Sequence, residues 1–290
     1  MHITELIRQK KFVITCEIDS PKGVNSETFL DKVDEVKNSV HAISISDNLR
    51  AVMRCSALAM CHLLKTRDIE PIMELNTRDR NRLALQSDLL AAATFGVENI
   101  IISSGYDVSL GDHRDASPVH DLDTVSLVKA ARDLNDERDF AGHSLDGPSN
   151  FCIGVLAEIG LKPDATQMDK LKRGVDAGAD FIVTQAMYDT AVLEEFLGSV
   201  GQFRLPVIVG HVMLKSASSA SFLNSNAPGI SIPERIIKQL EGLSREALFG
   251  TSQQITVEFI ESAKSLCQGV HLVPMGWERF IPHIVEAVGS

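Results

Sequence analysis

Cysteine and aromatic side chains are scarce in this sequence, and their scarcity excludes several kinds of site. The 290 residues include five cysteines, one tryptophan and two tyrosines. The cysteines form no Cys-x-x-Cys pair and no His-rich spacing, so the sequence predicts no zinc or iron–sulfur site and no other metal site. The simplest interpretation of the five cysteines is that they are small buried residues in a reducing compartment.

Basic residues are also fewer than acidic ones. Twenty-eight Lys and Arg residues stand against 39 Asp and Glu residues, which gives a formal net charge of −11 at pH 7. Such a chain would repel the phosphates of a nucleic acid, and no basic cluster lies beside aromatic residues to counter that repulsion. We therefore expect no nucleic-acid partner.

Long apolar runs are missing as well. The longest are far below the roughly 20 residues needed to cross a bilayer, so we expect no membrane span. The N-terminal segment, MHITELIRQKKF, starts like an amphipathic helix and lacks the apolar core of a signal peptide. A cytoplasmic location is the default expectation for such a sequence.

The sequence does contain eight short apolar runs, mostly 25–50 residues apart. Runs of this length, rich in Ile and Val and without polar alternation, are typical of parallel strands buried on both faces. The expected strands are FVITCEI (12–18), AISISD (42–47), EPIMELN (70–76), NIIISS (99–104), FCIGVLAE (151–158), FIVTQA (181–186), PVIVGHVM (206–213) and GVHLVPM (269–275).

Amphipathic helical stretches separate these strands. Residues 26–39 open with a serine N-cap, residues 80–96 end at Gly96, and residues 165–179 carry a glycine just before the sixth strand. Strand followed by helix, repeated eight times, predicts an α/β protein with a single (β/α)8 TIM barrel spanning residues 1–290. In this fold the active site lies at the C-terminal ends of the strands.

Two segments interrupt the regular repeat. A long polar loop follows the fourth strand at residues 105–120, and a helical insertion at residues 214–268 precedes the eighth strand. No shift in composition marks a second domain. Long loops at the catalytic face are commonly functional.

The polar residues that close the strands form a net acidic set. They are Glu17, Asp47, Glu74, Asn76, Ser103, Ser104, Glu158, Gln185, His211 and Lys215. The acidic members are candidates for general acid catalysis, because burial raises the pKa of a carboxyl and lets it hold a proton near neutral pH. Each could instead be a salt-bridged residue that fixes a loop. Composition and periodicity thus indicate a barrel enzyme and do not select a reaction.

Six segments, in order along the chain, resemble the methylenetetrahydrofolate reductase family. They are TCEIDSPKG (15–23), SISDNLRAVMRCSALAMC (44–61), NTRDRNRLALQSDLLAAATFGVENII (76–101), the stretch from GDH to HDLD (111–123), AGADFIVTQAMYD (177–189) and LKSASSASFLNSNAPGISIPERI (214–236). The resemblance implies a barrel that binds FAD. The flavin would take hydride from a reduced nicotinamide or an electron-donating partner subunit and reduce 5,10-methylenetetrahydrofolate to 5-methyltetrahydrofolate. Either a homo-oligomer or a hetero-oligomer is compatible with it.

The resemblance also implies roles for single residues. The family's catalytic Glu on the first strand corresponds to Glu17, which would act as the general acid that helps to open the five-membered ring of the folate. The family's Gln on the sixth strand corresponds to Gln185, which would hydrogen-bond the pterin and orient it. Tyr188 and His211 are expected beside the substrate, although packing in the core would explain either residue.

The residues expected to contact FAD are Ser46, Asp47, Glu74, Ser104, Gly105, Tyr106, Asp107, Glu158 and Arg173. Carboxylates at two of these positions, Glu74 and Glu158, replace other residue types that are common in the family. They weaken a site meant for a pyrophosphate.

The loop after the fourth strand departs from the family as well. The family usually reads Arg-Gly-Asp or Thr-Gly-Asp there, whereas this chain reads Ser104-Gly105-Tyr106 with Asp107 one place late. Either Asp107 substitutes through a shifted loop, or the charge is absent. Tyr106 could stack on a ring or anchor the loop. The alternatives to a flavoenzyme are a flavin-free relative that binds tetrahydrofolate and transfers a one-carbon or methyl group, and a non-catalytic binding subunit.

Overall fold

A computed structural model describes residues 1–9, 11–158, 164–227 and 229–289. Eight parallel strands close into one barrel in chain order, and β8 pairs with β1 to complete it. The strands are β1 (Val13–Ile18), β2 (Ala42–Ile45), β3 (Pro71–Asn76), β4 (Asn99–Ser103), β5 (Cys152–Ala157), β6 (Phe181–Ala186), β7 (Val207–Val212) and β8 (Gly269–Val273). The expected TIM barrel is confirmed, with every strand end within two residues of its predicted place.

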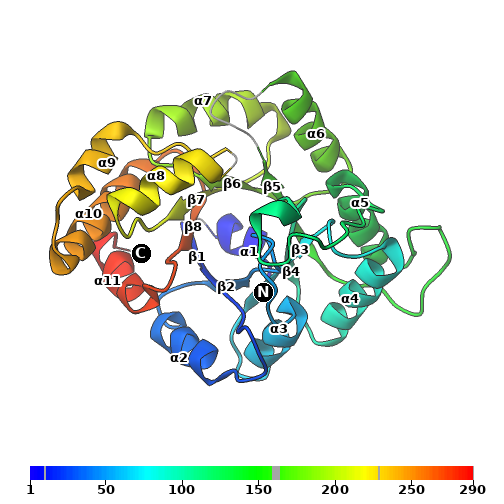
Figure 1. Cartoon of the computed structure of the whole chain (residues 1–290). Helices are drawn as coiled ribbons and strands as arrows, with labels where there is room; N and C mark the ends of the chain where they lie inside the picture. The colour runs from blue at the N-terminus through cyan, green and yellow to red at the C-terminus, as the bar shows by residue number, and fades with distance from the viewer. Residues whose placement is uncertain (10, 159–163, 228, 290) are drawn as a thin grey trace.

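Helices surround the strands (Figure 1). They are α1 (Ile3–Arg8), α2 (Glu27–Val36), α3 (Ala57–Lys65), α4 (Arg82–Thr94), α5 (Thr124–Asn135), α6 (Ala165–Asp176), α7 (Thr190–Val200), α8 (Ala217–Asn226), α9 (Glu234–Leu240), α10 (Arg245–Ala263) and α11 (Ile281–Ala287). Single 3-10 turns occur at η1 (Val108–Leu110), η2 (Gly201–Phe203) and η3 (Glu278–Phe280). The inserted helix α8 lies nearer the centre of the ring than α9 and α10 (Figure 1).

Side-chain caps fix where several helices begin. Asn81 accepts a hydrogen bond from the backbone N–H of Ala84 at the start of α4. At the start of α6, Asp164 and Gln167 each accept from the backbone N–H of the other residue. Such caps satisfy backbone donors that the first helical turn leaves without partners.

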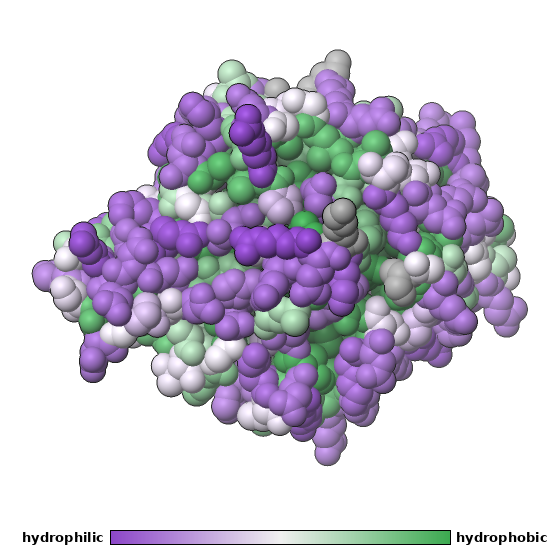
Figure 2. Space-filling model, turned by 180° about the vertical axis from the view of Figure 1, so that it is seen from behind, coloured by the Kyte–Doolittle hydropathy of each residue, from purple (hydrophilic) through white to green (hydrophobic). Residues whose placement is uncertain are grey.

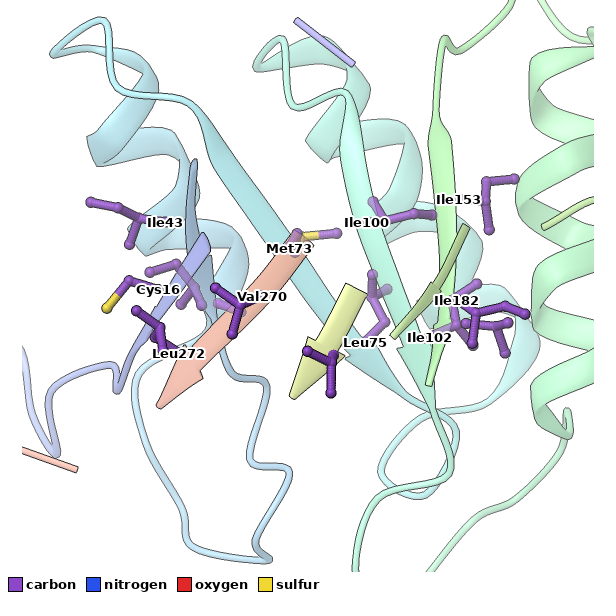
Figure 3. Packing of buried hydrophobic residues seen from close by; sticks show 14 of the residues in the cluster. Cys16, Ile43, Met73, Leu75, Ile100, Ile102, Ile153, Ile182, Val270 and Leu272 are labelled. Carbon is purple, nitrogen blue, oxygen red and sulfur yellow. The ribbon is translucent and has the colours of Figure 1, made fainter. Parts of the chain in front are cut away.

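The strands are apolar on both faces because each face packs against a different layer. One face packs against the helices, through residues such as Cys16, Ile43, Met73 and Val270 (Figure 3). The other face fills the barrel interior. This two-sided burial explains why the strands read as continuous apolar runs.

Helix α1 closes the N-terminal end of the barrel. Its buried residues Ile3 and Leu6 pack against Val13, Ile72 and Phe181 inside the barrel. The opposite, C-terminal end of the strands is therefore the one left for chemistry.

The molecular surface opposite to the view of Figure 1 is mostly hydrophilic, with smaller apolar areas between the polar residues (Figure 2). Among the helices that the structure describes, none combines the length and the apolar character that crossing a membrane would require.

Candidate active site

Inward-facing positions of the strands turn from apolar to polar toward their C-terminal ends. The change is concentrated on four adjacent strands, at Thr15 and Glu17 of β1, Ser44 of β2, Glu74 of β3 and His271 of β8, all of which are buried. The strand register places Glu17 beside Ser44 and Thr15 beside His271. A barrel interior made of apolar residues thus ends in a polar layer.

A pocket opens above this layer. Its polar lining residues are Glu17, Arg50, Glu74, Ser103, Tyr106, Thr184, Gln185, His211 and His271. Its apolar walls include Leu49, Ile101, Leu156, Val183 and Ile230. A few polar groups set in apolar walls suit a planar heterocycle that is held by stacking and read by hydrogen bonds.

Glu17 is an ionised carboxylate in an ion pair. Arg50 Nη1 donates to Glu17 Oε1 over 3.0 Å, and the same guanidinium also contacts Asp19. Burial acts to raise the pKa of Glu17, but the charge of Arg50 and then the contact with His271 outweigh it and lower the pKa to about 2. The raised pKa expected for strand-end carboxyls therefore does not hold for Glu17.

Glu74 has the opposite electrostatic environment. Ser44 Oγ donates to Glu74 Oε1 over 2.7 Å, and no ion pair with Lys or Arg is formed by Glu74 among the described residues. Burial and then the negative charge of Glu17 raise the pKa of Glu74 to about 7. A carboxyl that holds a proton near neutral pH is thus present, on β3 instead of β1.

His271 lies between the two carboxylates. Its Nε2 is 3.8 Å from Glu17 Oε2 and 4.0 Å from Glu74 Oε1, while Nδ1 is 2.9 Å from Thr15 Oγ1. One ligand atom from each of the three residues lies within 4.8 Å of the others, a spacing that a metal ion could bridge. We assign no metal here, because the Arg50 guanidinium already supplies a positive charge to Glu17.

Gln185 owes its position to an irregularity in β6. The register between β6 and β7 shifts between Val183 and Ala186, as in a β-bulge. Thr184 Oγ1 accepts from the backbone N–H of Gly210 and donates to the carbonyl of Gln185. Bulges of this kind re-aim side chains next to active sites. Gln185 is half-buried and lines the pocket.

His211 and Tyr188 belong mainly to the packing behind the pocket. The Tyr188 hydroxyl donates to the carbonyl of Val212 over 2.8 Å, and burial raises its pKa. His211 stacks on Phe259, with ring centroids 4.9 Å apart, and one edge of its ring borders the pocket. Core packing accounts for Tyr188, while His211 both packs in the core and lines the pocket.

The loop after β4 brings Tyr106 into the pocket and leaves Asp107 outside it. Asp107 is exposed, and its carboxylate accepts from the backbone N–H of Ser109 over 2.8 Å at the start of η1. Arg78 holds this loop, because its Nη1 donates to the carbonyl of Tyr106 over 2.7 Å. The Asp of the family's loop therefore has no counterpart in the pocket at Asp107.

The remaining residues expected to contact FAD are engaged with other protein groups. Asp47 is buried against Arg80. Glu158 accepts from the backbone N–H of Ser104 over 2.6 Å and pairs with Lys170 over 3.0 Å.

The residues expected to contact FAD offer little to a pyrophosphate. Arg173 is exposed and 3.9 Å from Asp123, and Lys170 of the same helix pairs with Glu158. Ser46 is buried. Gly105 packs against Asn76 and has a positive φ of 77°. Neither residue lines the pocket. A pyrophosphate needs free cations or backbone donors, which these residues do not supply.

Sequence reasoning missed four residues that shape this site: Thr15, Ser44, Arg50 and His271. A signal for three of them was present, since each interrupts an apolar strand at an inward-facing position. Arg50 gave none, because it reaches Glu17 from a loop 33 residues further along the chain.

Comparisons with known proteins point to one family. The family model described as methylenetetrahydrofolate reductase matches residues 2–289. Methylenetetrahydrofolate reductase 1 of Schizosaccharomyces pombe is 26% identical over 237 residues, and its counterpart named reductase 2 is 22% identical over 243 residues. These alignments cover 77% and 76% of this chain but only 36% of each relative, so the chain spans about a third of their length.

Among solved structures, an uncharacterized Clostridium thermocellum protein that binds two copies of 5-methyl-5,6,7,8-tetrahydrofolic acid superposes with a TM-score of 0.64 at 16% identity. The match covers 98% of this chain and 97% of that one. Oxaloacetate acetylhydrolase gives a TM-score of 0.56 at 10% identity, covering 97% of this chain and 81% of its own. At such identities the superpositions establish the shared barrel alone. The match along residues 2–289, in a barrel with this polar layer, places the chain in the methylenetetrahydrofolate reductase family.

Proposed function

We propose that this chain binds a reduced folate in the pocket at the C-terminal end of the barrel and reduces 5,10-methylenetetrahydrofolate to 5-methyltetrahydrofolate. The observation that carries the proposal is the buried pair of Glu17 and Glu74 in a pocket that Gln185 also lines. Family membership supports the reaction, and the folate bound by the C. thermocellum neighbour supports the class of ligand.

The reaction needs both a proton and a hydride. A proton must reach the nitrogen whose bond to the bridging methylene breaks, and a hydride must then reach the carbon of the resulting iminium. Carboxylic acids supply protons of this kind. We propose that the buried carboxyl pair of Glu17 and Glu74 supplies the proton, and that the Gln185 amide holds the pterin edge with one donor and one acceptor.

The apolar walls complete the site. Leu49, Ile101, Leu156 and Val183 would cover the faces of a pterin and exclude water from the opened ring. A dry pocket also strengthens the pull of the carboxylates on the iminium, because charges interact more strongly where the local dielectric is low.

A second candidate is favoured by one specific observation. In the family, FAD supplies the hydride, but the residues expected to hold its pyrophosphate are paired with other groups in this chain. We therefore derive no step through a flavin. The second candidate is a flavin-free folate protein that transfers a one-carbon or methyl group.

The test is a calorimetric titration with 5-methyltetrahydrofolate, with and without added FAD, together with a visible absorption spectrum. We expect binding that does not depend on FAD, and weakening by about tenfold in Gln185→Ala, since leaving the buried polar edge of a ligand without its partner costs about 1–3 kcal/mol. Gln202→Ala, an exposed glutamine in η2, is the matched control. Wild-type protein that does not bind the folate refutes the proposal.

Turnover separates the two candidates. Consumption of 5,10-methylenetetrahydrofolate with a reduced nicotinamide, and formation of the 5-methyl product, supports reduction. A yellow protein, or turnover that requires added FAD, supports the flavoenzyme. Folate binding without reduction under either condition supports the second candidate.

A further inference from the structure

Two carboxyl groups and an imidazole meet in the polar layer. Thr15 Oγ1 is 2.9 Å from His271 Nδ1 and 3.5 Å from the carbonyl of Val270. On the other side of the ring, His271 Nε2 is 3.8 and 4.0 Å from the two carboxylates, and one ligand atom from each of the three residues lies within 4.8 Å of the others. Two buried carboxylates at this spacing repel each other, so a proton on one of them lowers the electrostatic cost.

The partners of the two carboxylates decide where that proton is held. Glu17 has a guanidinium at 3.0 Å, which stabilises its charge. Glu74 has a hydroxyl donor at 2.7 Å and no ion pair with Lys or Arg among the described residues, while the negative charge of Glu17 opposes its ionisation. Two buried carboxylates this close cannot both ionise easily, and the one without a cation takes the proton.

We infer that Glu17 and Glu74 share one proton next to His271, that Glu74 is the member that holds it, and that Glu74 is a further catalytic residue of this site. This inference rests on the proposed function for its catalytic part. Glu74 lines the pocket, so its acidic proton can reach the substrate side.

The proton step balances without any further reactant. As the carbon–nitrogen bond of the folate ring breaks, the nitrogen takes the proton of Glu74 and Glu74 becomes a carboxylate. Arg50 balances part of the added negative charge, and solvent returns a proton to the pair after product leaves. The contacts of 3.8 and 4.0 Å between His271 and the two carboxylates are longer than hydrogen bonds.

Four elements contribute the groups that act on Glu74. They are Glu17 of β1, Ser44 of β2, Arg50 of the following loop and His271 of β8. The Cys61 thiol of α3 also interacts with this charge, and its raised pKa keeps it neutral. Of these groups only Glu17 makes ionisation of Glu74 harder.

Infrared spectroscopy of the folate-free protein tests the proton location by itself. We expect a band of a protonated carboxylic acid that disappears as the pH rises through about 7. Glu74→Gln should abolish it, while Glu17→Gln should move its titration to lower pH because the repelling charge is gone. Asp47→Asn, a second buried strand-end acid, is the matched control and should retain the band. A band that survives in Glu74→Gln overturns the inference.

A metal centre formed by Glu17, Glu74 and His271 is the alternative to a shared proton, and zinc is the probe for it. If stoichiometric zinc removes the band from chelator-treated protein and a chelator restores it, the three residues form a metal centre and the shared proton is wrong. We expect the band to be insensitive to zinc.

Kinetics test the catalytic part. Glu74→Gln should lower kcat by about 100-fold or more, in the range of general acid loss, with a change of less than about threefold in KM and with one limb of the pH profile lost. Glu74→Asp should restore part of kcat. An unchanged kcat overturns the catalytic assignment. Wild-type protein that gives the expected infrared result but binds no folate refutes the proposed function and leaves the shared proton standing.

Discussion

His211 is a neutral imidazole enclosed by the packing behind the pocket. It is 1% exposed, its Nδ1 is 3.0 Å from the carbonyl of Met187, and its Nε2 is 3.2 Å from the hydroxyl of Thr256. Burial lowers the pKa of His211 to about 4, although the Met187 carbonyl acts in the opposite direction. A charged imidazole would be expensive in this apolar setting.

This burial predicts a pH-dependent stability. The unfolded chain takes up a proton on this histidine near its ordinary pKa of about 6.5, whereas the folded protein does so only near 4. The contribution of neutral His211 to the free energy of unfolding is therefore intact above about pH 6.5. It is lost as the pH falls toward 4, by up to about 3 kcal/mol. His211→Asn, whose amide can still donate to Met187, should lose less stability over that range in urea unfolding.

The exposed His283 provides the control for that experiment. His283→Asn should lose stability with falling pH as the wild type does, because it keeps His211; titration of the carboxylates is common to all three proteins. Equal pH slopes for wild type and His211→Asn would show that the buried imidazole does not resist protonation.

Single residues of the site could be predicted from the sequence only in part. Glu17 and Gln185 were identifiable, because each closes a strand and lies in a motif that resembles the family. Which carboxyl holds a proton could not be predicted, since it depends on Arg50 reaching Glu17 and on the neighbouring Ser44 reaching Glu74. Those contacts are properties of the closed barrel.

At the scale of elements, β5 and β6 pack closely because β5 has a glycine opposite a large ring of β6. Gly154 of β5 is paired in register with Phe181 of β6. A Cβ at position 154 would lie 2.4 Å from the Phe181 ring, well inside van der Waals contact. The barrel interior has room for this ring only because its neighbour is glycine.

Gly154→Ala should therefore lower the free energy of unfolding by about 1–3 kcal/mol, the usual effect of overpacking a core. Adding Phe181→Leu should recover part of the loss, because the smaller side chain gives way. Gly198→Ala is the matched control: no atom lies within 4 Å of its new Cβ inside α7, so it should stabilise slightly. If both alanine variants behave alike in chemical denaturation, the ring contact does not matter.

Element boundaries were predictable where local chemistry sets them. Asn81 caps α4 next to the predicted helix start at residue 80, whereas Ser26, the predicted cap of α2, makes no side-chain capping hydrogen bond. Strands buried on both faces leave long apolar runs. The bulge in β6 was not predictable, because Thr184 and Gln185 continue the strand pattern without a break. It results from the hydrogen bond of Thr184 to Gly210 on the next strand.

At the scale of the whole molecule, the two ends of the barrel differ in chemical character. The N-terminal end is apolar and closed by α1, whose Ile3 is fully buried and whose backbone N–H donates to Asn99 over 2.9 Å. The C-terminal end carries the polar layer and the pocket. Eight strand–helix units in the sequence were enough to predict this division, since parallel barrels place their chemistry at one end.

This division predicts that stability and ligand binding can be damaged separately. Ile3→Ala leaves a cavity between α1 and the barrel interior and should lower the free energy of unfolding by about 2–4 kcal/mol. The dissociation constant for 5-methyltetrahydrofolate should stay within about twofold of wild type, because the pocket lies at the far end of the strands. Gln185→Ala should do the reverse, weakening the complex with little effect on unfolding. Both are measured by denaturant titration and calorimetry on the same preparations. A loss of folate affinity in Ile3→Ala while it is still fully folded would mean that the two ends are coupled through the barrel interior.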